Sequence, residues 1–223
     1  MRKSSIYVEV DIPSEDVHAA MVIIARFLEK NNLKINLSIS YNYEMEECGV
    51  YRPFEKGQEY RIFVNPSKCK TQEDVIKQEF EEPFAPGSPC DITIFGIIIH
   101  EFCHLLQYRT YPSIIKNYGE TFPTERLNLN EYSNNEIHDE IAEIMTLYIT
   151  NPYLLKLLSK LHFDFCKKYF KSPISCSPKR CAFIYKGWPP SVKEYLKDKW
   201  GIAYNIATKK FVRSNEKVNC LLY

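Results

Sequence analysis

The chain has 223 residues, 26% of them charged, and a formal net charge of +1. Its 45% of hydrophobic residues can bury a sizeable core and exclude a disordered chain, whereas the balanced charge argues against a general nucleic-acid-binding protein. With only 7 glycines and no GxGxxG string, the sequence also argues against a Gly-rich phosphate loop.

Three short segments in the first part of the chain have the alternating apolar pattern of strands. They are residues 6–10, 33–41 and 60–64. Residues 19–28 have helical periodicity and are expected to form a helix between the first two strands. Residues 71–78 are also expected to be helical, and the proline-rich residues 81–90 are expected to form a loop.

The rest of the chain is predicted to be mostly helical. Residues 92–108 contain no proline and are apolar almost all round, which predicts a buried central helix with Asp91 as its N-cap. Further helices are expected near Ile114 and over residues 135–149, 152–170 and 191–200. Strands that come early and helices that come late predict an α+β fold.

We expect one domain over residues 1–223. Its N-terminal lobe, residues 1–110, contains the predicted small mixed sheet and the central helix. Its C-terminal lobe, residues 111–223, is mostly helical.

The predicted central helix contains His100-Glu101-Phe102-Cys103-His104, which is an HExxH string. Helical residues four apart differ by about 40° in azimuth and about 6 Å in rise, so both imidazoles can bind one ion. Glu101 is turned by about 100° from His100 and can reach a water on that ion, as in zinc peptidases. Two histidines and a carboxylate are costly on an apolar helix unless something binds them, which disfavours the alternative of two satisfied core histidines.

A catalytic zinc takes three protein ligands, and the third is expected from the helix over residues 135–149. One face of this helix is apolar and is expected to meet the core, through Ile137, Ile141, Ile144 and Tyr148. Asp139 and Glu143 lie nearly opposite that face, and Glu136 and Glu140 lie between. All four carboxylates are candidate ligands, and the alternative is a solvated acidic face.

These two segments resemble the zincin metallopeptidases of the anthrax lethal factor type and related phage- and toxin-associated peptidase domains. That family has HEFxH on one helix and, on a later helix, an acidic ligand followed after two residues by Ala-Glu. This chain has HEFCH at residues 100–104 and then Asp139-Glu140-Ile141-Ala142-Glu143. The resemblance covers about a quarter of the chain and implies a zincin-like fold.

The resemblance implies that His100, His104 and Asp139 bind Zn²⁺ and that Glu101 is the general base. The family's third ligand is usually Glu, so Glu143 remains a second candidate ligand and Glu140 and Glu136 remain further alternatives. Glu143 would otherwise accept a hydrogen bond from a ligating histidine. In lethal factor a tyrosine seven residues before the ligand stabilises the transition state, and that position here is Tyr132.

Zincins also have a mixed sheet ahead of the HExxH helix, with an edge strand along the cleft. Residues 60–64 are the candidate for this edge strand, beside which a peptide could add through main-chain hydrogen bonds. The alternative is that residues 60–64 form a core strand.

Together these features predict a zinc-dependent endopeptidase that acts on a polypeptide and binds neither nucleic acid nor membrane. One alternative is a non-catalytic zincin-fold binding or virion protein with a structural zinc. The other is a zinc amidase that acts on a non-protein substrate. A second, structural zinc site is a further hypothesis, and its ligands would be His162, Cys166, Cys176 and Cys181. Their spacing is not that of a standard zinc finger, so the alternative is that these cysteines are simply buried.

The longest apolar run, residues 94–99, is too short for the ~20 residues of a membrane helix. The start of the chain lacks the apolar region of a signal peptide. We therefore expect a soluble cytoplasmic or intracellular protein, with delivery as a toxin or virion component left open. The 8 cysteines are expected to be reduced thiols.

Overall fold

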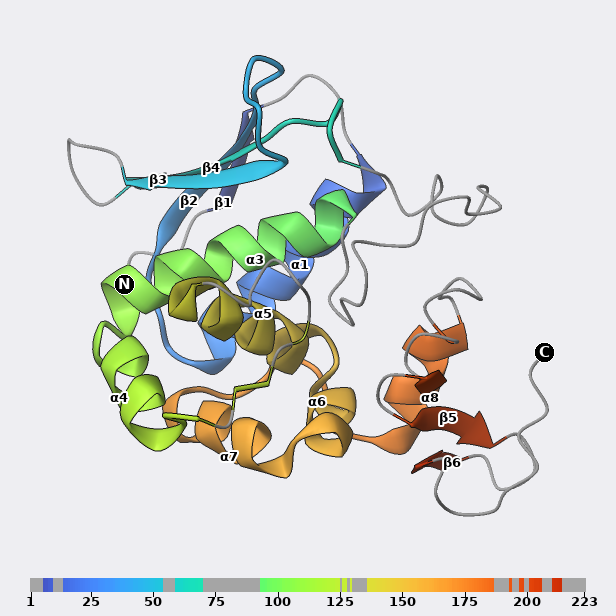
Figure 1. Cartoon of the computed structure of the whole chain (residues 1–223). Helices are drawn as coiled ribbons and strands as arrows, with labels where there is room; N and C mark the ends of the chain where they lie inside the picture. Colours follow the sequence, from blue (N-terminus) through green and yellow to red (C-terminus); the bar gives the residue numbers. More distant parts are fainter. Residues whose placement is uncertain are drawn as a thin grey trace.

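The structure is a computed structural model with an α+β fold, as the sequence predicts (Figure 1). It describes residues 6–9, 14–53, 59–69, 93–124, 126–127, 129, 136–186, 193, 197–198, 201–205 and 210–213. The expected helix over residues 71–78 and the expected loop over residues 81–90 lie outside this part of the chain. No helix in the described part is both long enough and apolar enough to span a membrane.

A four-stranded mixed sheet forms the upper layer in Figure 1. The order of its strands is β1 (Ile6–Glu9), β2 (Asn36–Tyr41), β4 (Glu59–Val64) and β3 (Gly49–Pro53). The first three of these are parallel, and β3 runs antiparallel to β4. The alternation seen in the sequence places Leu37, Ile39, Ile62 and Val64 on one fully buried face.

Residues 60–64 form a core strand, which was the alternative, and the edge-strand interpretation is wrong. β4 lies between β2 and β3 in the sheet, and the edge on this side is β3, for which the sequence predicts no strand. β3 is only five residues long, begins with Gly49 and ends with Pro53, so it has little of the pattern by which strands are recognised. The strand that borders the candidate site is therefore β3.

The buried face of the sheet is covered by two helices. Helix α1 (Glu15–Lys30) connects the parallel strands β1 and β2, and α3 (Ile94–Leu105) packs against α1, β3 and β4. Phe27 of α1 and Phe102 of α3 are both fully buried and meet edge to face, with ring centroids 5.6 Å apart. This packing fixes the HExxH segment between the sheet and the helical half of the molecule.

Helix α3 is shorter than the predicted helix over residues 92–108. Its N-cap is Thr93, whose hydroxyl accepts a hydrogen bond from Gly96 N at 3.4 Å, so the cap is not Asp91. After Leu105 the chain continues as a π-helix, η1 (Leu106–Thr110), in which Tyr111 N donates to Leu106 O at 2.8 Å. The wider turn changes the phase of the helix directly after His104.

The helical half begins with α4 (Ser113–Thr121), the short helix expected near Ile114. The remaining elements are α5 (Ile137–Thr150), α6 (Pro152–Leu158), α7 (Lys160–Tyr169), α8 (Pro178–Lys186), β5 (Ile202–Asn205) and β6 (Lys210–Arg213). The prediction of a single helix over residues 152–170 is wrong. Residues 152–170 form two helices because Ser159 is extended and caps α7, and the end of the chain contains a hairpin of β5 and β6. Most of the predicted helix over residues 191–200 lies outside the described residues.

Helix α5 lies beneath α3 in Figure 1 and is buried from Glu140 to Ile149. Glu140 is fully buried and faces away from the histidines. Its Oε1 accepts hydrogen bonds from Tyr118 OH at 2.9 Å and from Leu127 N at 2.7 Å, and its Oε2 lies 3.4 Å from Arg126 Nε. These contacts offset part of the cost of burying the carboxylate, although burial still raises the pKa of Glu140, and they fix the chain after α4 against α5.

Candidate metal centre

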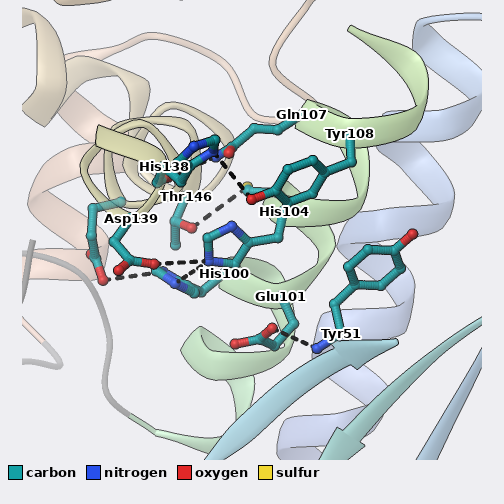
Figure 2. Close-up of polar contacts among 11 residues, drawn as sticks. Tyr51, His100, Glu101, His104, Gln107, Tyr108, His138, Asp139 and Thr146 are labelled. Atoms are coloured by element: carbon teal, nitrogen blue, oxygen red, sulfur yellow. Dashed lines mark hydrogen bonds and ion pairs between the residues drawn. The ribbon is translucent and has the colours of Figure 1, made fainter. Parts of the chain in front are cut away.

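The two histidines of the HExxH string lie on the face of α3 that meets α5 (Figure 2). Their Nε2 atoms are 3.0 Å apart, as expected for residues one helical turn apart. With Glu101 they form a group whose ligand atoms all lie within 4.8 Å of one another, and this group could hold a metal ion. No other group of three such side chains forms among the residues that the structure describes.

Helix α5 contributes two carboxylates, and each meets a different histidine. Asp139 Oδ1 lies 3.2 Å from His104 Nε2, on the side where the two Nε2 atoms converge. Glu143 Oε1 lies 3.1 Å from His100 Nδ1, on the far side of that ring. Both carboxylates therefore face the HExxH helix, and their positions differ relative to the Nε2 pair.

The converging atoms have the spacing of a metal site. Tetrahedral ligands at about 2.0–2.1 Å from an ion are separated from one another by about 3.3 Å. His100 Nε2, His104 Nε2 and Asp139 Oδ1 are spaced at 3.0 and 3.2 Å around His104. A single N–H on His104 cannot point at both neighbours, whereas one ion between the three atoms would be shared by all of them.

The electrostatics of the group favour a cation. The hydrogen bond with His104 lowers the pKa of Asp139 more than burial raises it, so this carboxylate is ionised at neutral pH. Burial lowers the pKa of His100, but Glu143, Glu101 and Asp139 outweigh burial and raise it overall. Three carboxylates around two imidazoles therefore create a negative potential that attracts a positive charge.

The contact between His100 and Glu143 determines which ring nitrogen of His100 can bind a metal. When Nδ1–H donates to Glu143, the lone pair of Nε2 is free and points toward His104 and Asp139. His104 Nδ1 is buried and has no such partner in the part of the chain that the structure describes. His100 thus contacts its carboxylate through Nδ1, which faces away from the histidine pair, whereas His104 contacts Asp139 through Nε2.

Glu101 is turned toward the sheet edge, and a backbone group holds it there. Tyr51 N on β3 donates a hydrogen bond to Glu101 Oε2 at 2.7 Å, as Figure 2 shows. The carboxylate is thus held beside the histidine pair but outside the hydrogen bonds that link the pair to α5. This is the position that the HExxH spacing predicts for a group that acts on a metal-bound water.

A glycine allows β3 to lie this close to α3. A Cβ atom at Gly49 would be 2.4 Å from Ile97 Cγ2 and 3.1 Å from Glu101 Cγ. Any side chain at this position therefore collides with the helix or with the carboxylate itself.

We expect Gly49→Ala to destabilise the fold by about 1–3 kcal/mol, because the added methyl group overpacks the contact between β3 and α3. Chemical denaturation measures this change. Val50→Ala is the matched control, because successive side chains of a strand point to opposite faces and Val50 therefore points away from α3. Equal stabilities of Gly49→Ala and the wild type would contradict the tight approach of β3.

Three residues beside the centre are not predicted from the sequence. Gln107 is buried, and its Nε2 donates to His138 O at 3.0 Å, which ties η1 to the first turn of α5. Tyr108 OH lies 3.1 Å from His138 Nδ1, and the two rings stack with centroids 5.6 Å apart. Tyr108 is four residues after His104, so the extension of the i, i+4 row was the available signal.

Two of the other candidate ligands, Glu136 and Glu140, are not part of the centre. Tyr132 lies outside the described residues. Glu136 is exposed at the N-cap of α5, and Glu140 faces Tyr118 on the opposite side of the helix. Neither carboxylate is therefore placed to act as the third ligand.

The proposed second zinc group does not assemble. Ser159 Oγ lies 2.8 Å from His162 Nδ1, and Tyr118 OH lies 3.0 Å from His162 Nε2, so both ring nitrogens are already bonded. Burial lowers the pKa of His162 to about 4, which keeps the ring neutral. Cys166 and Cys181 are buried thiols, whereas Cys176 is exposed. His162, Cys166 and Cys181 are therefore part of the buried core.

Comparison with protein-family models, curated proteins and solved structures finds no match to this chain. The chemistry of the centre therefore has to follow from its own residues. Two imidazoles and the Glu101 carboxylate lie within 4.8 Å of one another, Asp139 contacts His104, Glu143 contacts His100, and Glu101 is also held by Tyr51 N at the sheet edge.

Proposed function

We propose that the protein is a zinc-dependent endopeptidase with a zincin-like fold. The observation that carries this proposal is the group of His100, Glu101 and His104, whose ligand atoms lie within 4.8 Å of one another, with Asp139 Oδ1 3.2 Å from His104 Nε2. The mixed sheet and its antiparallel edge strand next to the HExxH helix support the zincin-like fold. The resemblance in residues 100–104 and 139–143 supports it independently.

His100, His104 and Asp139 are the proposed ligands. Two imidazoles and one carboxylate suit zinc, and three protein ligands leave the fourth position for water. A zinc ion held there lowers the pKa of that water and polarises a substrate carbonyl. Glu143 is proposed to act through His100. It accepts a hydrogen bond from His100 Nδ1–H and so leaves the lone pair of Nε2 available to the metal.

Glu101 is the proposed general base. Its carboxylate takes one proton from the attacking water and later gives that proton to the nitrogen of the leaving amine. The hydrogen bond from Tyr51 N to Oε2 fixes the carboxylate, and Oε1 remains for this proton transfer. Tyr132 remains the proposed donor to the developing oxyanion, on the basis of its offset from Asp139.

The polypeptide substrate is proposed to lie along β3. Cys48 O accepts from Asn65 N, so alternate residues of the strand, Gly49 and Tyr51, direct their main-chain groups away from β4. Tyr51 N–H already donates to Glu101, so an extended peptide could pair with the remaining main-chain groups of these two residues. This position favours an endopeptidase, because a strand can accommodate chain on both sides of the cleaved bond.

The two alternative functions predict different results from the same preparation. A structural zinc needs no base, so the placement of Glu101 by β3 disfavours a non-catalytic protein. An amidase for non-protein substrates would use the same centre and is distinguished only by its substrate. The test therefore has to measure both the metal and the bonds that are cleaved.

Elemental analysis after purification without added metal is expected to find one zinc per chain. Chelation is expected to abolish cleavage of a peptide library, and added zinc is expected to restore it. Absence of zinc together with no uptake on titration would overturn the proposal. Zinc without peptide cleavage would support a structural role, and cleavage restricted to non-peptide amides would support the amidase.

A further inference from the structure

Two cysteines that are far apart in the sequence meet at the start of the edge strand. Cys48 immediately precedes β3, and Cys69 lies in the turn after β4. Cys69 Sγ donates to Cys48 O at 3.2 Å, and Cys48 Sγ donates to Lys68 O at 3.2 Å. Each Sγ therefore contacts the backbone at or next to the other cysteine.

Asn65 holds the two backbone segments in place. Its N–H donates to Cys48 O at 2.9 Å, and its carbonyl accepts from Cys69 N at 3.2 Å. Its buried side chain donates to Met45 O at 2.6 Å. Each cysteine is therefore bonded through its backbone to the same residue, so their meeting does not depend on flexible side chains.

Both thiols are only partly buried, in contrast with Cys103, Cys166 and Cys181. The hydrogen bond from Cys69 and the nearby Lys68 ammonium lower the pKa of Cys48 to about 7 against the opposing effect of burial. A thiol with this pKa is partly ionised near neutral pH and reacts faster than an ordinary cysteine. Cys69, with a raised pKa, remains protonated beside it.

We propose that Cys48 and Cys69 are a thiol-exchange site that reacts with a small disulfide, such as oxidised glutathione, to form a reversible disulfide at the start of β3. The Cys48 thiolate attacks one sulfur of oxidised glutathione, the S–S bond of that molecule breaks, and one glutathione leaves. Cys69 loses its proton to water and attacks the Cys48 sulfur, and the second glutathione leaves. The two protein thiols lose two electrons and two protons, and oxidised glutathione becomes two reduced glutathiones.

This disulfide would fix the edge strand next to the base. Cys48 is adjacent to Gly49, whose backbone lies against Glu101, and Tyr51 N holds the carboxylate. The crosslink closes the loop between residues 48 and 69 and restricts β3 in the position that it already has. The inference rests on the thiol pair and the backbone around Asn65, and it does not depend on the proposed peptidase function.

The test is incubation of the full chain with oxidised glutathione, followed by peptide mapping by mass spectrometry and by thermal unfolding. The expected product is a Cys48–Cys69 linkage that dithiothreitol reverses, with a rise in Tm of about 5–10 °C. In Cys69→Ser the first step is expected to stop at one glutathione on Cys48. Cys48→Ser is expected to form no linkage and to show no rise in Tm.

Exposed Cys176 serves as the internal control for the reagent. Modification of Cys176 without any Cys48–Cys69 linkage in the wild type would overturn the proposal. An equal rise in Tm in Cys48→Ser would also overturn it, because another pair would then be responsible.

Discussion

Glu101→Gln is expected to bind zinc as the wild type does and to hydrolyse peptides at least about 10³-fold more slowly. A glutamine cannot accept the proton of the attacking water or return it to the leaving amine, so both proton transfers are lost. The loss should appear in kcat, because the amide keeps the size and position of the carboxylate. Steady-state kinetics on a cleaved peptide, together with the zinc content of the same preparation, measure both effects.

The structure makes this substitution a clean test. The side-chain oxygen of glutamine can still accept the hydrogen bond from Tyr51 N, so β3 and α3 should keep their contact. Thermal unfolding should therefore match that of the wild type. Cleavage at the rate of the wild type would show that Glu101 is not the base, and loss of zinc would show that it belongs to the ligand set.

Asp139→Ala is expected to abolish stable zinc binding, whereas Glu143→Ala is expected to weaken it by about 10–100-fold. Asp139 Oδ1 lies beside His104 Nε2, where the two Nε2 atoms converge, and Glu143 Oε1 lies beside His100 Nδ1, which faces away from that point. A lost ligand removes a bond to the metal. A lost acceptor on Nδ1 only loosens the orientation of one ring.

Competition with a chromogenic chelator measures both affinities in the same assay. Glu136→Ala is the matched control, because Glu136 is an exposed carboxylate at the start of the same helix. It should leave zinc affinity unchanged. If Asp139→Ala binds zinc as the wild type does and Glu143→Ala does not, the two roles are exchanged.

The parts of the site that the sequence predicts are those determined by local periodicity. The i, i+4 spacing of His100 and His104 requires only that residues 94–105 be helical, and the structure has a helix there. The positions of Asp139 and Glu143 follow from the apolar face of α5 in the same way. These predictions need no knowledge of which element packs against which.

The missed features depend on contacts between distant segments. Glu140 has the same chemical character as Asp139, and only its contacts with Tyr118 and Leu127 show that it is buried on the other side of α5. β3 is identified as the edge strand only by its antiparallel pairing with β4. The π-turn after Leu105 likewise has no marker in the residues 106–110 themselves.

A main-chain group, rather than a side chain, holds the proposed base at the sheet edge. Every amino acid except proline supplies a backbone N–H at position 51. The contact with Glu101 therefore does not depend on which side chain is present there. The residue type is instead restricted two positions earlier, at Gly49, where even one methyl group would collide with Ile97 of α3. Related chains would therefore be expected to exclude proline at position 51 and to retain glycine at position 49, whereas the Tyr51 side chain is constrained separately by its packing against the core and the Tyr60 ring.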